Sequence, residues 1–213
     1  MQALEKIITT KSWVTALIML LFIGVVLLKA LDTNRFKGSV FSLFNINFIE
    51  SESEENRTFF DSFKVVIFMF TVIVLSLLAY RFKTYRLSIN VTNFSSYLPI
   101  FLSLLSYFLI KRTLEYLLFY LFLIKRDVRF FIISKVNYLY TITFLLYLVI
   151  VLSEYIGFKQ VYLFYFAALL FIVRFVIHLV ANKKLIFNKL FYFILYICAV
   201  EIAPLFILFK MMF

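Results

Sequence analysis

The sequence predicts an all-α fold, a polytopic transmembrane helix bundle with about six spans, and three observations predict it. Hydrophobic residues make up 65% of the 213 residues, whereas the surface of a soluble protein needs far more polar side chains. The apolar residues gather in stretches long enough to cross a bilayer as helices, which takes about 20 residues. The 3 Gly and 2 Pro leave these stretches almost free of helix breakers. A chain of this length has room for a single transmembrane domain, 1–213, and for no sizeable soluble one.

The first two predicted spans end at basic residues. Span one covers residues 13–28, where Trp13 anchors the helix at the interface and Lys29 closes it. We take it as a retained span rather than a signal peptide, because no small-residue cleavage site follows it. Span two covers residues 63–80 and stops at Arg81.

The third span is the longest apolar stretch, residues 97–124. It follows Asn and Ser residues that accept hydrogen bonds from the free amides of a helix start, and Pro99 fits its first turn. At ~1.5 Å per residue the stretch is about 40 Å long, which exceeds the ~30 Å hydrocarbon thickness of a bilayer. We expect one long tilted helix, because splitting it at Lys111 leaves two pieces too short to span.

Three further spans follow. Span four covers residues 136–152, and a tight turn that contains Gly157 leads into span five, residues 161–180. Span six covers residues 190–209. No repeat of fixed period relates the spans to one another.

The connection 31–62 is the one substantial loop, and we expect it to be interfacial and acidic. Four apolar residues recur in it at helical spacing, which predicts a short amphipathic helix on the membrane surface: Val40, Phe41, Phe44 and Phe48. The acidic run at 50–55 is typical of a solvated tether, and a docking contact for a basic partner is the alternative.

The distribution of basic residues predicts the orientation. The chain has 22 Lys and Arg against 11 Asp and Glu, a net charge of +11. Twelve basic residues lie in loops one–two, three–four and five–six, and seven lie on the other side, so the first set should be cytoplasmic and both termini periplasmic. Because this excess lies in short loops, it indicates contact with anionic lipids of the bilayer and not binding of nucleic acid.

Charged side chains inside the spans are the candidate site. A charge at the bilayer centre costs at least ~2.5–3.5 kcal/mol on insertion scales, so such residues normally face the bundle interior and pair. We expect a buried polar network of six residues: Lys111, Arg112, Glu115, Arg174, His178 and Glu201.

Depth along the helices suggests pairs within this network. Counting from the span ends places Lys111 and Glu201 near the midplane and Arg174 about 10 Å from the end of span five. Glu201 would then pair with Lys111 or Arg112, and Glu115 with Arg174, while local pairs of Glu115 within span three compete. Pro204 removes an amide donor close to Glu201 and predicts a helix kink there.

Three interpretations of these charges stay open: a structural polar network, a proton or ion pathway, and a pocket for an anionic substrate. Catalytic and cofactor motifs are absent from the sequence, which has neither a Gly-rich phosphate loop nor a His-Glu-x-x-His motif. One His and one Cys, Cys198, cannot form a metal site of several His and Cys ligands. A Lys or Glu that acts on a lipid remains an alternative.

Residues 195–205 read LYICAVEIAPL, and they include Cys198, Glu201 and Pro204. This stretch resembles the closing signature of an uncharacterised integral-membrane family, typical of Bacteroidota and known only as a domain of unknown function. The resemblance implies a bacterial inner-membrane location and no known activity. Members of that phylum carry a type IX secretion and gliding apparatus powered from the inner membrane, and lineage alone connects the chain with it.

The leading functional hypothesis is a non-enzymatic structural or assembly subunit of a cell-envelope complex. Its partners would be the lipid bilayer and other envelope membrane proteins, and the oligomeric state stays open. Small residues such as Ala167, Ala199 and Ala203 would permit close helix packing. The first alternative is a small ion-coupled transporter or energiser that uses Glu201 with Lys111, Arg112 or Arg174, and the second is a lipid-modifying membrane enzyme.

Overall fold

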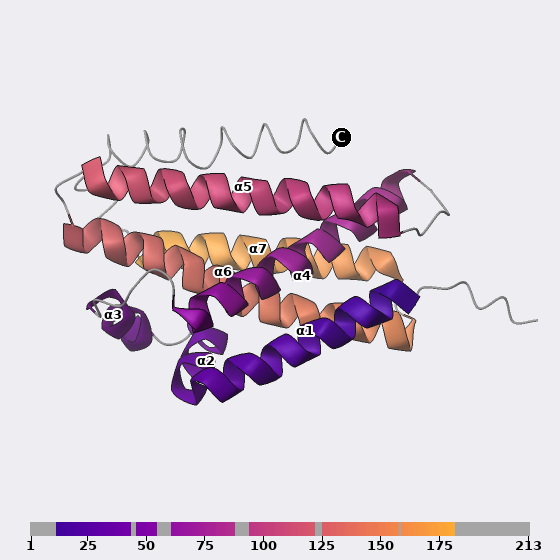
Figure 1. The fold of residues 1–213 in the computed structure, drawn as a ribbon, viewed down its shortest axis with the longest axis horizontal. Coiled ribbons are helices and arrows are strands. Elements are labelled where there is room, and N and C mark those ends of the chain that lie inside the picture. Colours follow the sequence, from indigo (N-terminus) through magenta and orange to yellow (C-terminus); the bar gives the residue numbers. More distant parts are fainter. Residues whose placement is uncertain are drawn as a thin grey trace, which may run out of the picture.

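The fold is given by a computed structural model that describes residues 12–43, 46–54, 61–87, 94–121, 125–157 and 159–181 (Figure 1). In these residues every regular element is an α-helix, which confirms the all-α fold class. The seven described helices are α1 (Ser12–Leu31), α2 (Thr33–Val40), α3 (Ile46–Glu54), α4 (Ser62–Leu87), α5 (Phe94–Leu121), α6 (Lys125–Ile156) and α7 (Gln160–Ala181).

Five of the described helices are long and apolar enough to cross a membrane. Their candidate spans are Trp13–Leu31, Ser62–Arg86, Phe94–Glu115, Phe130–Ile156 and Gln160–Ala181. They correspond to the first five predicted spans, so the chain is a multi-pass helical membrane protein. The predicted sixth span, 190–209, lies outside the described residues.

Helices α4 and α6 form the centre of the bundle and run in the same direction. Thr71 contacts Thr143 and Arg81 contacts Ser153, and both pairs are 72 residues apart in sequence. Within the described bundle 50% of the α6 span and 44% of the α4 span is buried, compared with 22% for α1 and 17% each for α5 and α7. Most of the span in each of these three outer helices is therefore not buried within the described bundle.

The contact between α4 and α6 is made of tightly packed apolar side chains. Five of its aliphatic residues are completely buried: Ile67, Leu77, Ile142, Leu146 and Ile150. Next to them the ring of Phe70 stacks on Phe144, with the ring centroids 4.8 Å apart. Lipid tails are as apolar as these side chains, so close packing and hydrogen bonds between helices hold the centre together.

Helix α6 is longer than the predicted fourth span. It begins at Lys125 and ends at Ile156, whereas the apolar pattern predicts a span over 136–152 and a basic loop before it. The difference arises because Lys and Arg are good helix formers, so a helix continues where its apolar run stops. The turn after α6 agrees with the prediction, since Gly157 has a φ of 77°, which favours glycine.

The connection 31–62 contains two short helices where the sequence pattern predicts one. The turn at 41–43 separates α2 from α3, and the side chains of Ser39, Ser42 and Ile49 are buried. Both helices pack against α6, and α3 takes up most of the acidic run, which is therefore helical there and not a tether. The spacing of apolar residues did not predict that α2 and α3 pack against α6, because polar residues of this connection make part of that contact through hydrogen bonds.

Candidate functional site

The bundle has two chemically different ends. Trp13 at the start of α1 contacts Tyr80 near the end of α4 and Tyr97 near the start of α5, so successive long helices alternate in direction. We call the end formed by Trp13, Tyr80, Arg81, Tyr97 and Glu154 the aromatic end. We call the opposite end, which contains Asp32, Arg35, Asp61, Glu115 and Lys135, the charged end.

A buried ion pair joins α5 to α6 at the charged end. The Nζ atom of Lys135 lies 3.4 Å from Oε1 of Glu115, and both residues are 4% exposed. Arg174 of α7 donates a hydrogen bond of 3.0 Å from Nη2 to the backbone carbonyl of Lys135. Three helices therefore meet at Lys135, a residue that the sequence pattern predicts in a loop.

The packing of α5 against α4 fixes the level of Lys111 relative to α4. The rings of Phe68 and Phe108 face each other at 6.3 Å, so the antiparallel helices α4 and α5 are level at that point. Following both helices from this pair brings Ser62, the first residue of α4, close to the level of Glu115. Lys111, Arg112 and Glu115 consequently lie at about the level where α4 begins, and the position of Lys111 at the midplane stays a prediction.

The other predicted site residues on α5 and α7 lie near this pair. The Nζ atom of Lys111 is 5.7 Å from the centroid of the Tyr107 ring. Arg112 is half-buried, and its positive charge repels that of Lys64. The imidazole of His178 packs against Phe131, with ring centroids 4.6 Å apart. Glu201 and Pro204 lie outside the described residues, so the network of six and the kink stay predictions.

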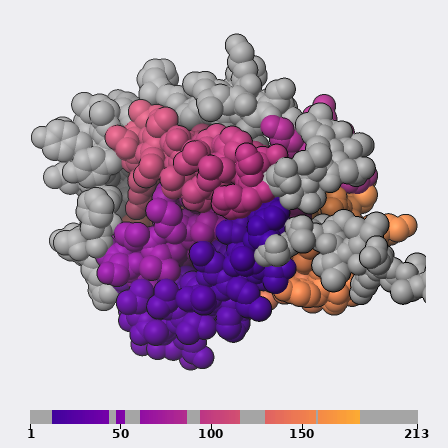
Figure 2. All heavy atoms as spheres, turned by 45° about the vertical axis from the view of Figure 1, so that its right-hand side comes forward, coloured from indigo at the N-terminus to yellow at the C-terminus, as the bar shows by residue number. Residues whose placement is uncertain are grey.

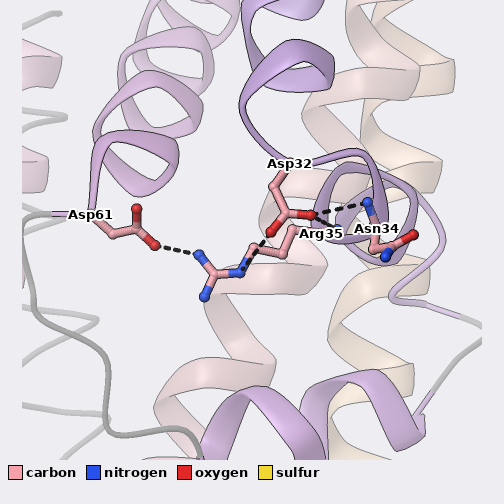
Figure 3. Close-up of polar contacts among 4 residues, drawn as sticks. All are labelled: Asp32, Asn34, Arg35 and Asp61. Atoms are coloured by element: carbon pink, nitrogen blue, oxygen red, sulfur yellow. Dashed lines mark hydrogen bonds and ion pairs between the residues drawn. The ribbon is translucent and has the colours of Figure 1, made fainter.

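A second group at the charged end is centred on Arg35 (Figure 3). Asp32 caps α2, because its Oδ1 accepts hydrogen bonds from the backbone amides of Asn34 at 3.1 Å and Arg35 at 3.0 Å. The guanidinium of Arg35 lies between two carboxylates, with Nε 3.5 Å from Asp32 and Nη1 donating to Asp61. This contact ties the start of α2 to the residue that precedes α4.

The environment of Asp61 favours its charged form. Burial by itself raises the pKa of the Asp61 carboxyl, but the hydrogen bond and the positive charge of Arg35 act against it. The backbone amide of Phe63 and the charge of Lys64 add to the effect of Arg35, and the pKa of Asp61 falls below its ordinary value. The sequence pattern did not predict that Arg35 and Asp61 belong to a charged group. Asp32, three residues before Arg35, was a usable signal, because an Asp at this distance can cap a helix that contains the Arg.

Hydroxyl and amide groups attach α2 and α3 to the middle of α6. The hydroxyls of Ser42 and Thr141 are 2.7 Å apart, and Thr141 also donates to the carbonyl of Ser39 at 2.7 Å. Asn137 donates from Nδ2 to the carboxylate of Glu52 at 2.8 Å. The connection 31–62 is therefore part of the bundle.

The aromatic end contains one further ion pair. Arg81 of α4 donates from Nη1 to Ser153 at 2.7 Å and from Nη2 to Glu154, both on α6. The ring of Trp13 lies beside Tyr80 and Tyr97, at centroid distances of 5.2 and 5.5 Å. The sequence pattern treats Arg81 and Glu154 only as the ends of spans, and their pairing appears because α4 and α6 run side by side.

Three ion pairs, Arg35–Asp61, Arg81–Glu154 and Lys135–Glu115, join parts of the bundle that are distant in sequence. In the part of the chain that the structure describes, no group of three or more His, Cys, Asp or Glu residues could hold a metal ion. The hydroxyls of Ser103 and Ser106 in α5 donate to carbonyls of their own helix. This arrangement can hold helices together and keep charges buried.

Comparison with known proteins gives a family but not an activity. No match is found among the curated proteins or among the solved structures. One family model, described as a domain of unknown function (DUF4271), matches residues 14–212. The match begins one residue after the start of the first candidate span and includes the other four spans that the structure describes. Because it extends over nearly the whole sequence, the chain belongs to the DUF4271 family.

Proposed function

We propose that the chain is a non-enzymatic structural or assembly subunit of a membrane protein complex in the bacterial cell envelope. The observation that carries the proposal is an exposed apolar stripe on α7, which we call the α7 seam. It consists of Tyr162, Tyr165, Leu169, Ile172 and Val176, each at least 50% exposed in the described structure. The residues alternate in steps of three and four, the spacing at which one helix packs along another.

The opposite face of α7 accounts for its attachment to the bundle. Leu163, Ala167 and Leu170 are buried there, so Ala167 serves packing inside the chain and is not available to a partner. The outer face of α1 is similarly apolar, with Phe22 and Ile23 more than half exposed, and Figure 2 shows α1 forming much of one side of the molecule. A rigid bundle with apolar lateral faces fits a role in holding neighbouring membrane proteins.

The proposal includes an inner-membrane location with the charged end in the cytoplasm. Lys111, Arg112 and Arg174 belong to that end in addition to the loop residues, which strengthens the basic asymmetry. The start of α1 then lies on the periplasmic side. Cysteine labelling in whole cells tests this in a Cys198→Ser background: Lys159→Cys should react with an impermeant maleimide, and Lys37→Cys should react only after lysis.

Site-specific photo-crosslinking in cells tests the subunit role. A photoreactive amino acid at Leu169, which is 56% exposed, should give a product with another protein, whereas the same residue at Leu170, 8% exposed, should react only within the chain. These adjacent leucines form a matched pair. Products of position 169 with lipid alone, or only with this chain's own residues, would contradict the proposal.

The transporter alternative predicts a different result. The chain reconstituted alone in liposomes would then carry a flux that Glu201→Gln abolishes. A flux of that kind, together with no protein product from the α7 seam, would favour transport over assembly.

A further inference from the structure

A small cavity opens at the aromatic end, where α1, α4, α6 and α7 meet. Its volume is about 40 Å³, more than the ~10–15 Å³ that one water molecule needs. Six of its lining residues carry aromatic rings or polar groups: Trp13, Tyr80, Arg81, Thr84, Glu154 and Gln160. Trp13 and Gln160 lie at the first turns of their helices, so the cavity is at the level where the spans meet the lipid headgroups.

Opposite charges lie together in the cavity wall. Arg81 is 8% exposed and forms an ion pair with Glu154. A guanidinium has five N–H donors, and the described contacts of Arg81, to Ser153 and Glu154, each engage one nitrogen. Arg81 therefore has donors left for a further acceptor such as a phosphate oxygen.

A buried hydroxyl on the same wall also needs a polar neighbour. Tyr80 is 6% exposed, and among the described residues its Oη has no hydrogen-bond partner. Leaving such a group unsatisfied is unfavourable, so sites of this kind are normally completed by a ligand or by water. The rings of Tyr80 and Trp13 meet edge to face at 5.2 Å and form an electron-rich wall that attracts a cation.

We propose that this cavity binds the headgroup of a zwitterionic phospholipid such as phosphatidylethanolamine. The phosphate would contact Arg81, and the ammonium would lie against Glu154 and the rings of Trp13 and Tyr80. The lining has one positive and one negative side chain, which complements a headgroup with both charges better than an anionic headgroup. The cavity itself accommodates one polar group of the headgroup, and the rest would remain at the membrane surface.

Trp13 is the single tryptophan of the chain and lines the cavity, so its fluorescence reports on binding there. The full chain, purified in detergent, is titrated with short-chain phosphatidylethanolamine, short-chain phosphatidylglycerol or glycerophosphoethanolamine. We expect a saturable change with phosphatidylethanolamine, at a concentration roughly tenfold lower than for phosphatidylglycerol. Equal responses to both lipids would overturn the headgroup assignment, and equally tight binding of glycerophosphoethanolamine would overturn the assignment to a membrane lipid.

Two threonines of equivalent local geometry supply the variant and its control. The hydroxyls of Thr84 and Thr113 each donate to the carbonyl one turn earlier at 2.9 Å, but only Thr84 lines the cavity. Thr84→Leu should fill the cavity and weaken the phosphatidylethanolamine response about tenfold or more, whereas Thr113→Leu should leave it unchanged. Both variants leave Arg81 and Glu154 unchanged, and equal Tm values for the two variants and the native chain show that each is folded. An unaltered response in Thr84→Leu would refute binding at this cavity.

Discussion

Removing one member of the Glu115–Lys135 pair should destabilise the bundle more than removing both. The side chains of Lys135 and Glu115 are 5% and 6% exposed, and their charged atoms are 3.4 Å apart. Glu115→Leu leaves the Lys135 ammonium without its carboxylate in an apolar environment. Breaking a buried pair in this way costs about 3–5 kcal/mol, because the remaining charge has lost both water and its counter-ion.

The double variant Glu115→Leu/Lys135→Met replaces the pair with apolar side chains of similar size. Such a replacement is often neutral or stabilising, so we expect it to recover most of the loss, to within about 1 kcal/mol of the native chain. Arg174 bonds to the backbone carbonyl of Lys135, so this contact is kept in both variants. In a chain of 213 residues the single variant should lower the Tm by about 6–20 °C.

The assay is unfolding of the purified chain in a fixed mixture of mild and denaturing detergents. Lys111→Met is the control, since the half-buried Lys111 lies over the Tyr107 ring and should cost at most about 1 kcal/mol. If the double variant loses as much stability as the sum of the two single variants, the pair does not couple and the reasoning fails. A loss below about 1 kcal/mol for Glu115→Leu would refute it as well.

Three other substitutions test separate contacts. Asp61→Asn should lower the Tm at neutral pH, because the pKa of Asp61 is lowered in the folded chain and its charged form stabilises the fold. The difference in Tm from the native chain should shrink as the pH falls below about 4, where Asp61 becomes protonated. A constant difference from pH 7 to pH 3 would contradict this. Gly38→Ala should destabilise the bundle by roughly 1–3 kcal/mol in the same unfolding assay, because a Cβ there overlaps the Phe48 ring. Gly24→Ala is its control: the added Cβ would be 3.8 Å from the nearest atom, so this variant should be neutral or stabilising. Thr141→Val should lower the free energy of unfolding by about 1–3 kcal/mol, because Ser42 and the carbonyl of Ser39 lose their hydrogen bonds to the Thr141 hydroxyl. Thr113→Val, at an exposed site, should lower it by less than about 0.5 kcal/mol.

The apolar runs were sufficient to predict the long helices. The thickness of the hydrocarbon layer requires about 20 apolar residues per span, so five spans can be recognised without any tertiary information. Their limits were less predictable. Helix α6 starts at Lys125 because helix propensity continues through basic residues, and hydropathy measures only the part that meets lipid.

The candidate site was only partly predictable. The cost of burying charge was reason enough to single out Glu115 and Arg174, and the structure places both next to Lys135. Lys135 itself could not be recognised, since a basic residue near a span end has the same sequence pattern whether it faces solvent or a neighbouring helix. Counting residues from the ends of an apolar run also gives no information on the level at which α5 packs against α4, which the contact between Phe68 and Phe108 shows.

The sequence by itself determined that this chain is a multi-pass helical membrane protein, because hydrophobicity and helix length are local properties. Tertiary structure alone decided that α4 and α6 form the centre, that α2 and α3 pack onto α6, and that Arg81 meets Glu154. These contacts depend on which helices become neighbours and at what relative height. Every apolar helix satisfies its own backbone and fits lipid equally well, so the choice of neighbours rests on side-chain packing and polar contacts across the bundle.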